Sequence, residues 1–494
     1  MTFRTAPRLL IAAAGIVALS ATAQETITLE DAIQQALAKN YSIRVESFGP
    51  RIAAAELLQA QGLFDPTLRV SYNRSEDGAS QPTDPFSNTR PPASIIQLDD
   101  YQASLGGRTA WGSTYALTGA VQNQRGTFNN FTDQFYSFGG LRVTQPLLRG
   151  FGFGPSLVEV RVARANRNIS EWQYRAAIID TITNVIRLYN DLWFAQETLK
   201  TARTSRNLAE QLLQENEKRV KIGSMAPADV TVARTRVVSS EEDIEIAERG
   251  LRDAQNVFRQ LITDSLRPEL DVPLTIARPE TPAVPVLDRV GDLQRAFELR
   301  PDYQQAKAMV DASKARASSA RSFLLPQVDF VGSYGYNGSG DTFREAVRDA
   351  RRAETESWSA GAVVSLPIPL REGRGRHAAA KFSLQRAETD LQRVEQDIVV
   401  RVGNAAGGIE SAGRRVQTAS LARRLAEESL TAEQKRLQVG QSSTFTVLQF
   451  QEVFSRAAIS EYRAIADYNQ ALAEYDRQIG STLAVHGVAL KVGR

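Results

Sequence analysis

Residues 156–222 have the sequence SLVEVRVARANRNISEWQYRAAIIDTITNVIRLYNDLWFAQETLKTARTSRNLAEQLLQENEKRVKI, which contains neither Gly nor Pro. As a continuous helix it would extend about 100 Å at ~1.5 Å per residue, which is more than the height of a compact domain. Its apolar residues recur every three or four positions, the spacing of a seam that packs on neighbouring helices. The seam consists of Trp172, Ala176, Ile179, Ile182, Ile186, Tyr189 and Trp193. The stretch therefore predicts a very long, coiled helix.

The second half of the chain predicts two more long helices. One is free of Gly and Pro and keeps the same apolar spacing at Val447, Phe450, Phe454, Ala458, Tyr462, Ile465, Tyr468, Leu472, Tyr475 and Ile479. The other is interrupted by Gly403, Gly407, Gly408 and Gly413. A glycine weakens a helix interior by about 1 kcal/mol relative to alanine. Two interpretations stay open here: a belt of irregular structure halfway along the helices, or close contact between helices.

Four short segments of the first half return in the same order in the second half. The number of residues between the two members of a pair is equal for the first two pairs and smaller for the last two. The pairs are Ile33, Ala36, Leu37 and Asn40 with Leu293, Ala296, Phe297 and Arg300; Phe64–Pro66 with Leu324–Pro326; Val143–Pro146 with Val364–Pro367; and Lys218–Gly223 with Lys435–Gly440. We therefore predict two copies of one unit, residues 24–262 and 291–482. A Pro-rich, extended linker at 263–290 joins them and could belong to the same belt, and a tail at 483–494 follows.

Strands are expected where the helices stop, at about 67–145 and 327–367. After Pro66, Leu68, Val70 and Tyr72 alternate with polar residues, as in a barrel wall between lipid and water. A strand of an ordinary sandwich would show the same alternation. We favour the barrel, because helices of about 100 Å leave little of the chain for a partner sheet. A polar loop is expected between the strands of the second copy.

The chain begins with the pattern of a secretory signal: Arg4 and Arg8, the apolar run Leu9–Leu19, and small residues up to Ala23. Cleavage is expected after Ala23, and a buried N-terminal helix is the alternative. The apolar run is too short to span a bilayer, which takes roughly 20 apolar residues. Because no Cys follows to carry a lipid, we predict an exported protein without a lipid anchor.

Composition argues against several functional classes. The 59 basic and 56 acidic residues give a formal charge of +3, which offers no reason to expect a nucleic-acid partner. Cys is absent, and the two histidines, His377 and His486, have no acidic cluster of metal-ligand spacing beside them. Thiol nucleophiles and disulfides are excluded, and a metal site or a His-dependent triad is disfavoured. Neither an enzyme nor a cofactor is expected.

Glycines cluster where a strand should pass into a helix. Gly150, Gly152 and Gly154 follow the first set of strands, and Gly373 and Gly375 follow the second. A phosphate-binding loop would need a GxGxxG or Walker pattern, and these clusters have neither. We interpret both as flexible strand-to-helix bends.

A repeated Lys-Arg-x-x-x-Gly element marks the end of a long helix in each copy. Gly223 and Gly440 can adopt the positive φ that ends a helix, and the basic residues before them oppose the helix dipole. Ser224–Asp229 and Ser442–Thr446 should cap the returning helices. Each element is thus a helical hairpin tip, which is either a simple loop or a docking or gating edge. The candidate docking residues are Lys218, Arg219, Gly223, Ser224, Lys435, Arg436, Gly440 and Ser442.

Together these features resemble the TolC-like outer-membrane efflux proteins, or outer membrane factors, of Gram-negative bacteria. The resemblance spans about residues 28–482, and its carriers are Thr28–Ala32 through Asn40, Phe64–Pro66, Thr144–Gly150 and the two hairpin elements that end at Gly223 and Gly440. It implies a mainly helical fold with a β-barrel part. Three chains would share one barrel in outer-membrane lipid and one periplasmic helical tunnel.

The resemblance also implies a function. Family members are passive exit ducts of tripartite efflux pumps or type I secretion systems, without catalysis. Their hairpin tips face the inner membrane and dock on a periplasmic adaptor, which links them to an inner-membrane pump or ABC exporter. The alternative function is an exported coiled-coil scaffold without a lumen.

Two features depart from the family pattern. Thr446 and Gln449 stand where the family has an aspartate pair that narrows the entrance, whereas Asp229 holds the comparable place after the first tip and could form a ring of three carboxylates. The second departure is length, since the segment between Pro66 and Pro146 is about twice as long as the one between Pro326 and Pro367. Two strands in each copy would give about 12 in a trimer, and four plus two would give about 18. We favour the smaller barrel with a larger surface loop.

Overall fold

The computed structural model describes residues 26–268, 272 and 274–489. The predicted signal sequence and its cleavage site after Ala23 lie outside these residues. The chain forms two compact units. The hairpin unit comprises 26–40, 182–284 and 409–473, with the gaps already given, and the sheet unit comprises 41–181, 285–408 and 474–489.

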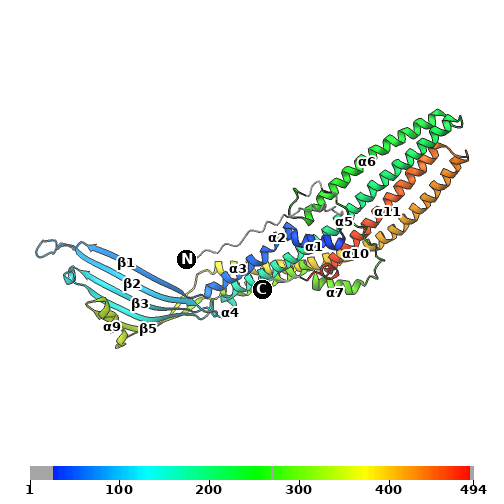
Figure 1. Cartoon of the computed structure of the whole chain (residues 1–494). Helices are drawn as coiled ribbons and strands as arrows, with labels where there is room; N and C mark the ends of the chain where they lie inside the picture. Colours follow the sequence, from blue (N-terminus) through cyan, green and yellow to red (C-terminus); the bar gives the residue numbers. More distant parts are fainter. Residues whose placement is uncertain (1–25, 269–271, 273, 490–494) are drawn as a thin grey trace, which may run out of the picture. The chain divides into compact units, whose positions relative to one another are not determined.

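The strands of the sheet unit form one antiparallel sheet in chain order (Figure 1). They are β1 (Thr67–Ala79), β2 (Ser94–Arg108), β3 (Thr114–Gly126), β4 (Gln134–Pro146), β5 (Gln327–Gly340) and β6 (Thr355–Ser365). The first copy thus supplies four strands and the second supplies two. Our preference for two strands in each copy was wrong, because the additional length of the first copy forms a further hairpin instead of a loop. The described residues contain no second sheet that could form a sandwich.

One face of this sheet is apolar. The pairing register places one large apolar residue of each strand in a single row across all six strands, which we call the apolar row: Leu68, Leu105, Leu117, Leu141, Tyr334 and Trp358. All six are exposed in the chain, from 43% for Leu105 to 70% for Trp358. The opposite face carries small or polar neighbours such as Ser104, Thr118 and Gly140 at the same level. The alternation predicted for β1 therefore extends over the whole sheet.

The long helices follow a similar order in the two predicted copies. The first copy contains α1 (Leu29–Lys39), α2 (Tyr41–Glu46), α3 (Phe48–Gln61), η1 (Gly62–Phe64), η2 (Thr127–Asn129), α4 (Phe153–Ser156), α5 (Val158–Lys221) and α6 (Pro227–Ile262). The second contains α7 (Arg289–Leu299), α8 (Pro301–Arg321), η3 (Ser322–Leu324), α9 (Phe343–Arg352), α10 (Arg371–Gln438), α11 (Thr444–Ile479) and α12 (Thr482–Val485). Both α6 and α11 have 36 residues. None of the described helices is both long and apolar enough to cross a membrane.

The very long helix predicted from the opening stretch is confirmed as α5, which has 64 residues. Most of its apolar seam is buried, namely Ile179, Ile182, Ile186, Tyr189 and Trp193. In the hairpin unit, the later part of α5 runs beside α6, α10 and α11 (Figure 1), and side chains of α5 contact α6 and α11. The seam is thus the core of a helix bundle.

The glycines of α10 do not interrupt it, so an irregular belt within this helix is wrong. A Cβ atom on Gly413 would lie 2.6 Å from Val284 Cγ2, so the close contact at this glycine is with the linker and not, as the second interpretation expected, with another helix. Nearby, the Tyr468 hydroxyl donates to the carbonyl of Pro282, 3.0 Å away. In contrast, a Cβ atom on Gly403 or Gly407 would meet no atom of the described chain within 4 Å.

A buried polar contact is duplicated as well. Asn40 follows α1 in the first copy, and its counterpart Arg300 follows α7 in the second. Asn40 Nδ2 donates to the carbonyl of Leu261 near the end of α6, at 3.2 Å. Arg300 Nη1 donates to the carbonyl of Gln478 near the end of α11, at 3.0 Å. Each copy therefore ties its short first helix to the end of its returning helix through the same position.

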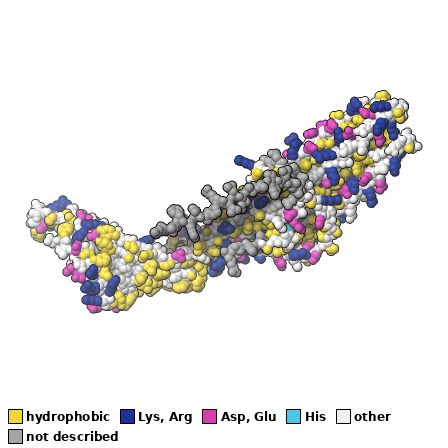
Figure 2. Space-filling model, in the orientation of Figure 1, with side chains coloured by type: hydrophobic (Ala, Val, Ile, Leu, Met, Phe, Trp, Pro, Cys, Tyr) yellow, Lys and Arg dark blue, Asp and Glu magenta, His cyan; other side chains and the backbone are white. Residues whose placement is uncertain are grey.

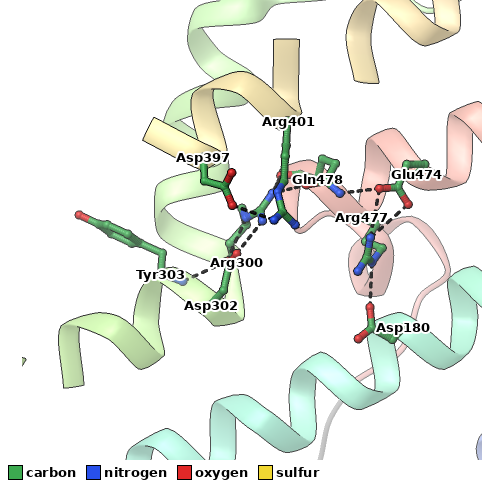
Figure 3. Close-up of polar contacts among 9 residues, drawn as sticks. All are labelled: Asp180, Arg300, Asp302, Tyr303, Asp397, Arg401, Glu474, Arg477 and Gln478. Carbon is green, nitrogen blue, oxygen red and sulfur yellow. Dashed lines mark hydrogen bonds and ion pairs between the residues drawn. The ribbon is translucent and has the colours of Figure 1, made fainter. Parts of the chain in front are cut away.

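Ion pairs surround this contact in the second copy (Figure 3). Arg300 also contacts Asp302, with Nη2 and Oδ2 2.6 Å apart. Burial alone would raise the pKa of the Asp302 carboxyl, but the hydrogen bond and charge of Arg300 lower it below its ordinary value. Arg477 bridges from α11 to Asp180 on α5, 2.8 Å away, and to Glu474 on its own helix. This network joins α5, α8 and α11 within the sheet unit.

Candidate functional site

The two hairpin tips of the hairpin unit share one turn geometry. Gly223 and Gly440 adopt φ values of 76° and 77°, in the left-handed region that favours glycine. The residue after each glycine donates its backbone N–H to the carbonyl of the arginine five positions earlier, at 2.9 Å in both tips. The helix ends predicted at these two glycines are confirmed.

The caps of the returning helices are only partly as expected. Helix α11 follows Ser443, whose hydroxyl accepts from the backbone N–H of Thr446 at 3.2 Å. Helix α6 follows Ala226, which offers no side-chain cap, and Pro227 occupies its first turn. Ser224 instead donates to the carbonyl of Arg219 at 3.1 Å, and so completes the end of α5. The expected side-chain cap for α6 was wrong, because proline in the first turn removes a donor that would need one.

Polar side chains join the two tips. Arg219 Nη1 donates to the carbonyl of Leu437 at 2.8 Å. The fully buried Asn216 donates to Thr444 Oγ1 at 3.0 Å and contacts the carbonyl of Asp229 at 3.4 Å. These bonds lie beside a small buried cluster of Leu212, Leu430, Leu437 and Val447. Arg219 therefore links the two helical hairpins of one chain through a hydrogen bond.

The basic residues predicted to dock a partner differ in their surroundings. Arg436 pairs with Glu433 at 3.3 Å, and Glu433 also accepts a hydrogen bond from Ser442. Lys218 and Lys435 are exposed on the last turns of α5 and α10. In the described part of the chain, neither lysine takes part in an ion pair. Lys221, in the same last turn of α5, is exposed and likewise in no ion pair among the described residues. Lys218, Lys221 and Lys435 are thus lysines of the tips that remain open to a partner.

The residues considered for an entrance constriction lie at the start of the returning helices. Asp229 is half-buried in the first turn of α6. Thr446 is half-buried, and its hydroxyl lies 2.9 Å from that of Ser443, whereas Gln449 is exposed one turn later on α11. Asp229 is thus the acidic group among these three positions.

The strand-to-helix bends differ between the copies. Gly150 and Gly152 have φ values of 83° and 89° between β4 and α4, as a bend requires, and Gly154 lies within α4. Gly373 and Gly375 lie inside α10, so a bend at these positions was wrong. A Cβ atom on Gly373 would lie 2.2 Å from the carbonyl oxygen of Phe323, which explains a glycine there by close backbone approach.

The described residues contain no group of three or more His, Asp and Glu side chains that could hold a metal ion. The tips instead carry exposed lysines at the ends of two helices, and polar side chains link the two hairpins. This arrangement suits reversible contact with another protein.

Long paired helical hairpins together with an antiparallel sheet that is apolar on one face define the outer-membrane channel class of fold. The model of the outer membrane efflux protein family matches residues 32–263 and 293–481, and the chain belongs to this family. The resemblance to the TolC-like proteins is thereby confirmed. Family members are efflux channels.

Individual relatives are distant. The chain is 24% identical over 306 residues to the pyoverdine export outer membrane protein OpmQ of Pseudomonas aeruginosa, covering 60% of each chain. It is 22% identical over 249 residues to the outer membrane protein TolC of Vibrio cholerae, covering 49% of this chain and 55% of that one. The matches thus span between half and two thirds of these relatives. The solved outer-membrane channel OprN superposes with a TM-score of 0.69 at 18% identity, over 92% of this chain and 90% of that one.

Proposed function

We propose that three copies of this chain form a passive outer-membrane conduit of a tripartite efflux or type I secretion system. The observation that carries the proposal is the open, six-stranded sheet with one exposed apolar face. Its edge strands β1 and β6 are exposed along almost their whole length. Exposed edges invite pairing with another chain, and closure into a barrel removes them.

The strand number supports threefold closure. Six strands are too few for a barrel with a water-filled lumen, whereas barrels of about 16–18 strands leave an aqueous channel. Three sheets would supply about 18, with the apolar row toward lipid and the opposite, polar face toward the lumen. A scaffold without a lumen would leave the apolar row in water, which disfavours that alternative.

The remaining parts of the proposal follow the family. The chain is exported by a signal sequence cleaved after Ala23, and its tips face the inner membrane. Asp229 of the three copies forms an acidic ring at the entrance, with Thr446 and Gln449 close to it. The conduit has no catalytic role, because its cargo is delivered by the inner-membrane partner.

Detergent extraction followed by planar-bilayer recording tests the conduit. We expect the mature protein in the outer-membrane fraction as a trimer that conducts ions after reconstitution. Recovery as a soluble monomer, or a trimer without conductance, would remove the proposal.

We propose further that Lys218 and Lys435 dock the periplasmic adaptor. Reversing both charges, Lys218→Glu with Lys435→Glu, should weaken adaptor capture at least tenfold, since each exposed lysine then repels the surface it attracted. Photo-crosslinking of trimer to adaptor in membranes measures this. Lys307→Glu with Lys381→Glu, two lysines away from the tips, is the control of equal charge change. Equal crosslinking of the tip variant and the wild type would count against the assignment.

A further inference from the structure

Helix α9 lies between β5 and β6, where the sequence predicts a polar loop. It packs on the sheet through Phe343, whose ring meets those of Tyr101 at 5.7 Å and Phe135 at 6.4 Å. Ser137 Oγ donates to the carbonyl of Ala346 at 2.7 Å. By the strand register, Tyr101, Phe135 and Ser137 share the face of the apolar row. Helix α9 therefore covers part of the apolar face.

The helix is held firmly in this position. A Cβ atom on Gly338 would lie 2.3 Å from the carbonyl oxygen of Ala346, so glycine is what lets the helix approach β5. The backbone N–H of Ser339 donates to Asp349 Oδ2 at 3.0 Å. Thr342 caps the first turn by accepting from the N–H of Glu345. These contacts make α9 a fixed part of the sheet surface.

Four arginines form one stripe of α9: Arg344, Arg348, Arg351 and Arg352. At about 100° per residue they fall within roughly 100° of the helix circumference, apart from the apolar residues that face the sheet. All four are exposed, and in the part of the chain that the structure describes none of them forms an ion pair. Figure 2 shows basic side chains gathered over this helix, beside the apolar surface of the sheet. The stripe is thus a group of positive charges without a partner among the described residues.

Helix α9 packs on the part of the strands where a membrane–water boundary is expected. Tyr72 and Tyr101 stand opposite each other on β1 and β2, on the apolar face. Two positions farther along the strands, the same face carries Arg74 and Asp99, which pair with each other at 3.7 Å. Tyrosines are typical of the interfacial belt of membrane barrels. Because Phe343 packs on Tyr101, α9 sits where the apolar face ends.

We propose that α9 binds the phosphate groups of the outer-leaflet glycolipid and so anchors the rim of the barrel. This inference rests on the proposed function, since it needs the apolar row to face lipid. Guanidinium groups bind phosphate in bidentate geometry, and a stripe that lies beside a lipid-facing surface meets lipid headgroups first. A helix that is basic on one side and apolar on the other is typical of a segment lying in the interface.

Binding of bisphosphorylated lipid A to the purified trimer in detergent tests the proposal. Removing two charges, Arg348→Gln with Arg351→Gln, should weaken binding about 30-fold, at ~1 kcal/mol for each basic residue. The charge-preserving variant Arg348→Lys with Arg351→Lys should retain most of the affinity. Arg386→Gln with Arg424→Gln, two exposed arginines of α10, is the matched control and should bind as the wild type does.

The other arms separate the possible ligands. Dephosphorylated lipid A should bind the wild type as weakly as it binds the glutamine variant, and inorganic phosphate should not displace the lipid at comparable concentration. Equal lipid A binding by the glutamine variant and the wild type, an equal loss in the α10 control, or displacement by free phosphate would overturn the inference. Conductance of the same samples tests the proposed function separately from lipid A binding. A failure of the lipid-binding proposal can therefore be told apart from a failure of the conduit proposal.

Discussion

Replacing Leu117 by arginine is expected to abolish the proposed membrane-embedded trimer. Leu117 lies in the middle of the apolar row, between Leu105 and Leu141, and is 57% exposed in the chain. Arginine on the lipid face of a barrel costs about 2–4 kcal/mol at the bilayer midplane, so three copies cost roughly 6–12 kcal/mol. That is comparable to the whole stability of a typical domain, about 5–15 kcal/mol. The measurement is the amount of heat-resistant trimer in the outer-membrane fraction.

The neighbouring residue provides the control. Thr118 has its side chain on the opposite face, paired with Ser104 and Gly140, and would point into the lumen. Thr118→Arg introduces the same charge next to Leu117 but into water, so we expect the trimer to form and its ion selectivity to shift toward anions. If both variants assembled equally well, the apolar row would not face lipid.

A disulfide between α5 and α11 is expected to block transport by at least tenfold. The hydroxyls of Ser205 and Ser455 lie 2.9 Å apart, so cysteines at these two positions point toward each other. The native chain has no Cys, which makes the pair the only thiols present. We expect opening to separate the hairpins of each chain, since a small apolar cluster and a few polar contacts, Arg219 to Leu437 among them, join them at their tips.

Substrate export by cells carrying Ser205→Cys with Ser455→Cys, before and after reductant, measures the effect. Export should fall on oxidation and return on reduction, whereas each single cysteine variant should export normally under both conditions. Full crosslinking with unchanged export would show that opening does not move α5 relative to α11.

Much of the fold could be predicted because the repeated patterns are local. The apolar residues of α5 fall on one face only if the segment is helical, whatever surface that face packs on. The glycines of the tips indicate the end of a helix because glycine readily adopts a positive φ. The predicted duplication rests on markers such as Asn40 and Arg300, which are separated by the same number of residues as the next pair of markers. In the structure these two side chains perform the same task, each holding the end of a returning helix.

The strand number was missed because the length between Pro66 and Pro146 fits either a further hairpin or a larger surface loop. Two adjacent acids in the middle of β2, Asp99 and Asp100, are also unusual in a membrane strand. In the structure, Asp99 lies beyond the end of the apolar face and pairs with Arg74 and Arg125 from both neighbouring strands. The sequence shows the charges, but their neutralisation depends on the register of three strands.

Two features of the sites depended on contacts between distant segments. The glycine at position 373 is explained by the backbone of Phe323, at the end of another helix, and not by a local bend. Arg219 was grouped with Lys218 as a docking residue, yet it bonds to Leu437 of the other hairpin. Helix α9 did have a local signal, because Phe343, Ala346, Val347 and Ala350 follow helical spacing.

Electron microscopy of the purified, detergent-extracted particle, viewed end-on, shows whether three chains enclose a lumen. We expect a threefold ring of density around an open bore, with a belt of detergent around the part that contains the sheet. A compact globule, or a rod with density filling its axis, would contradict the proposed conduit.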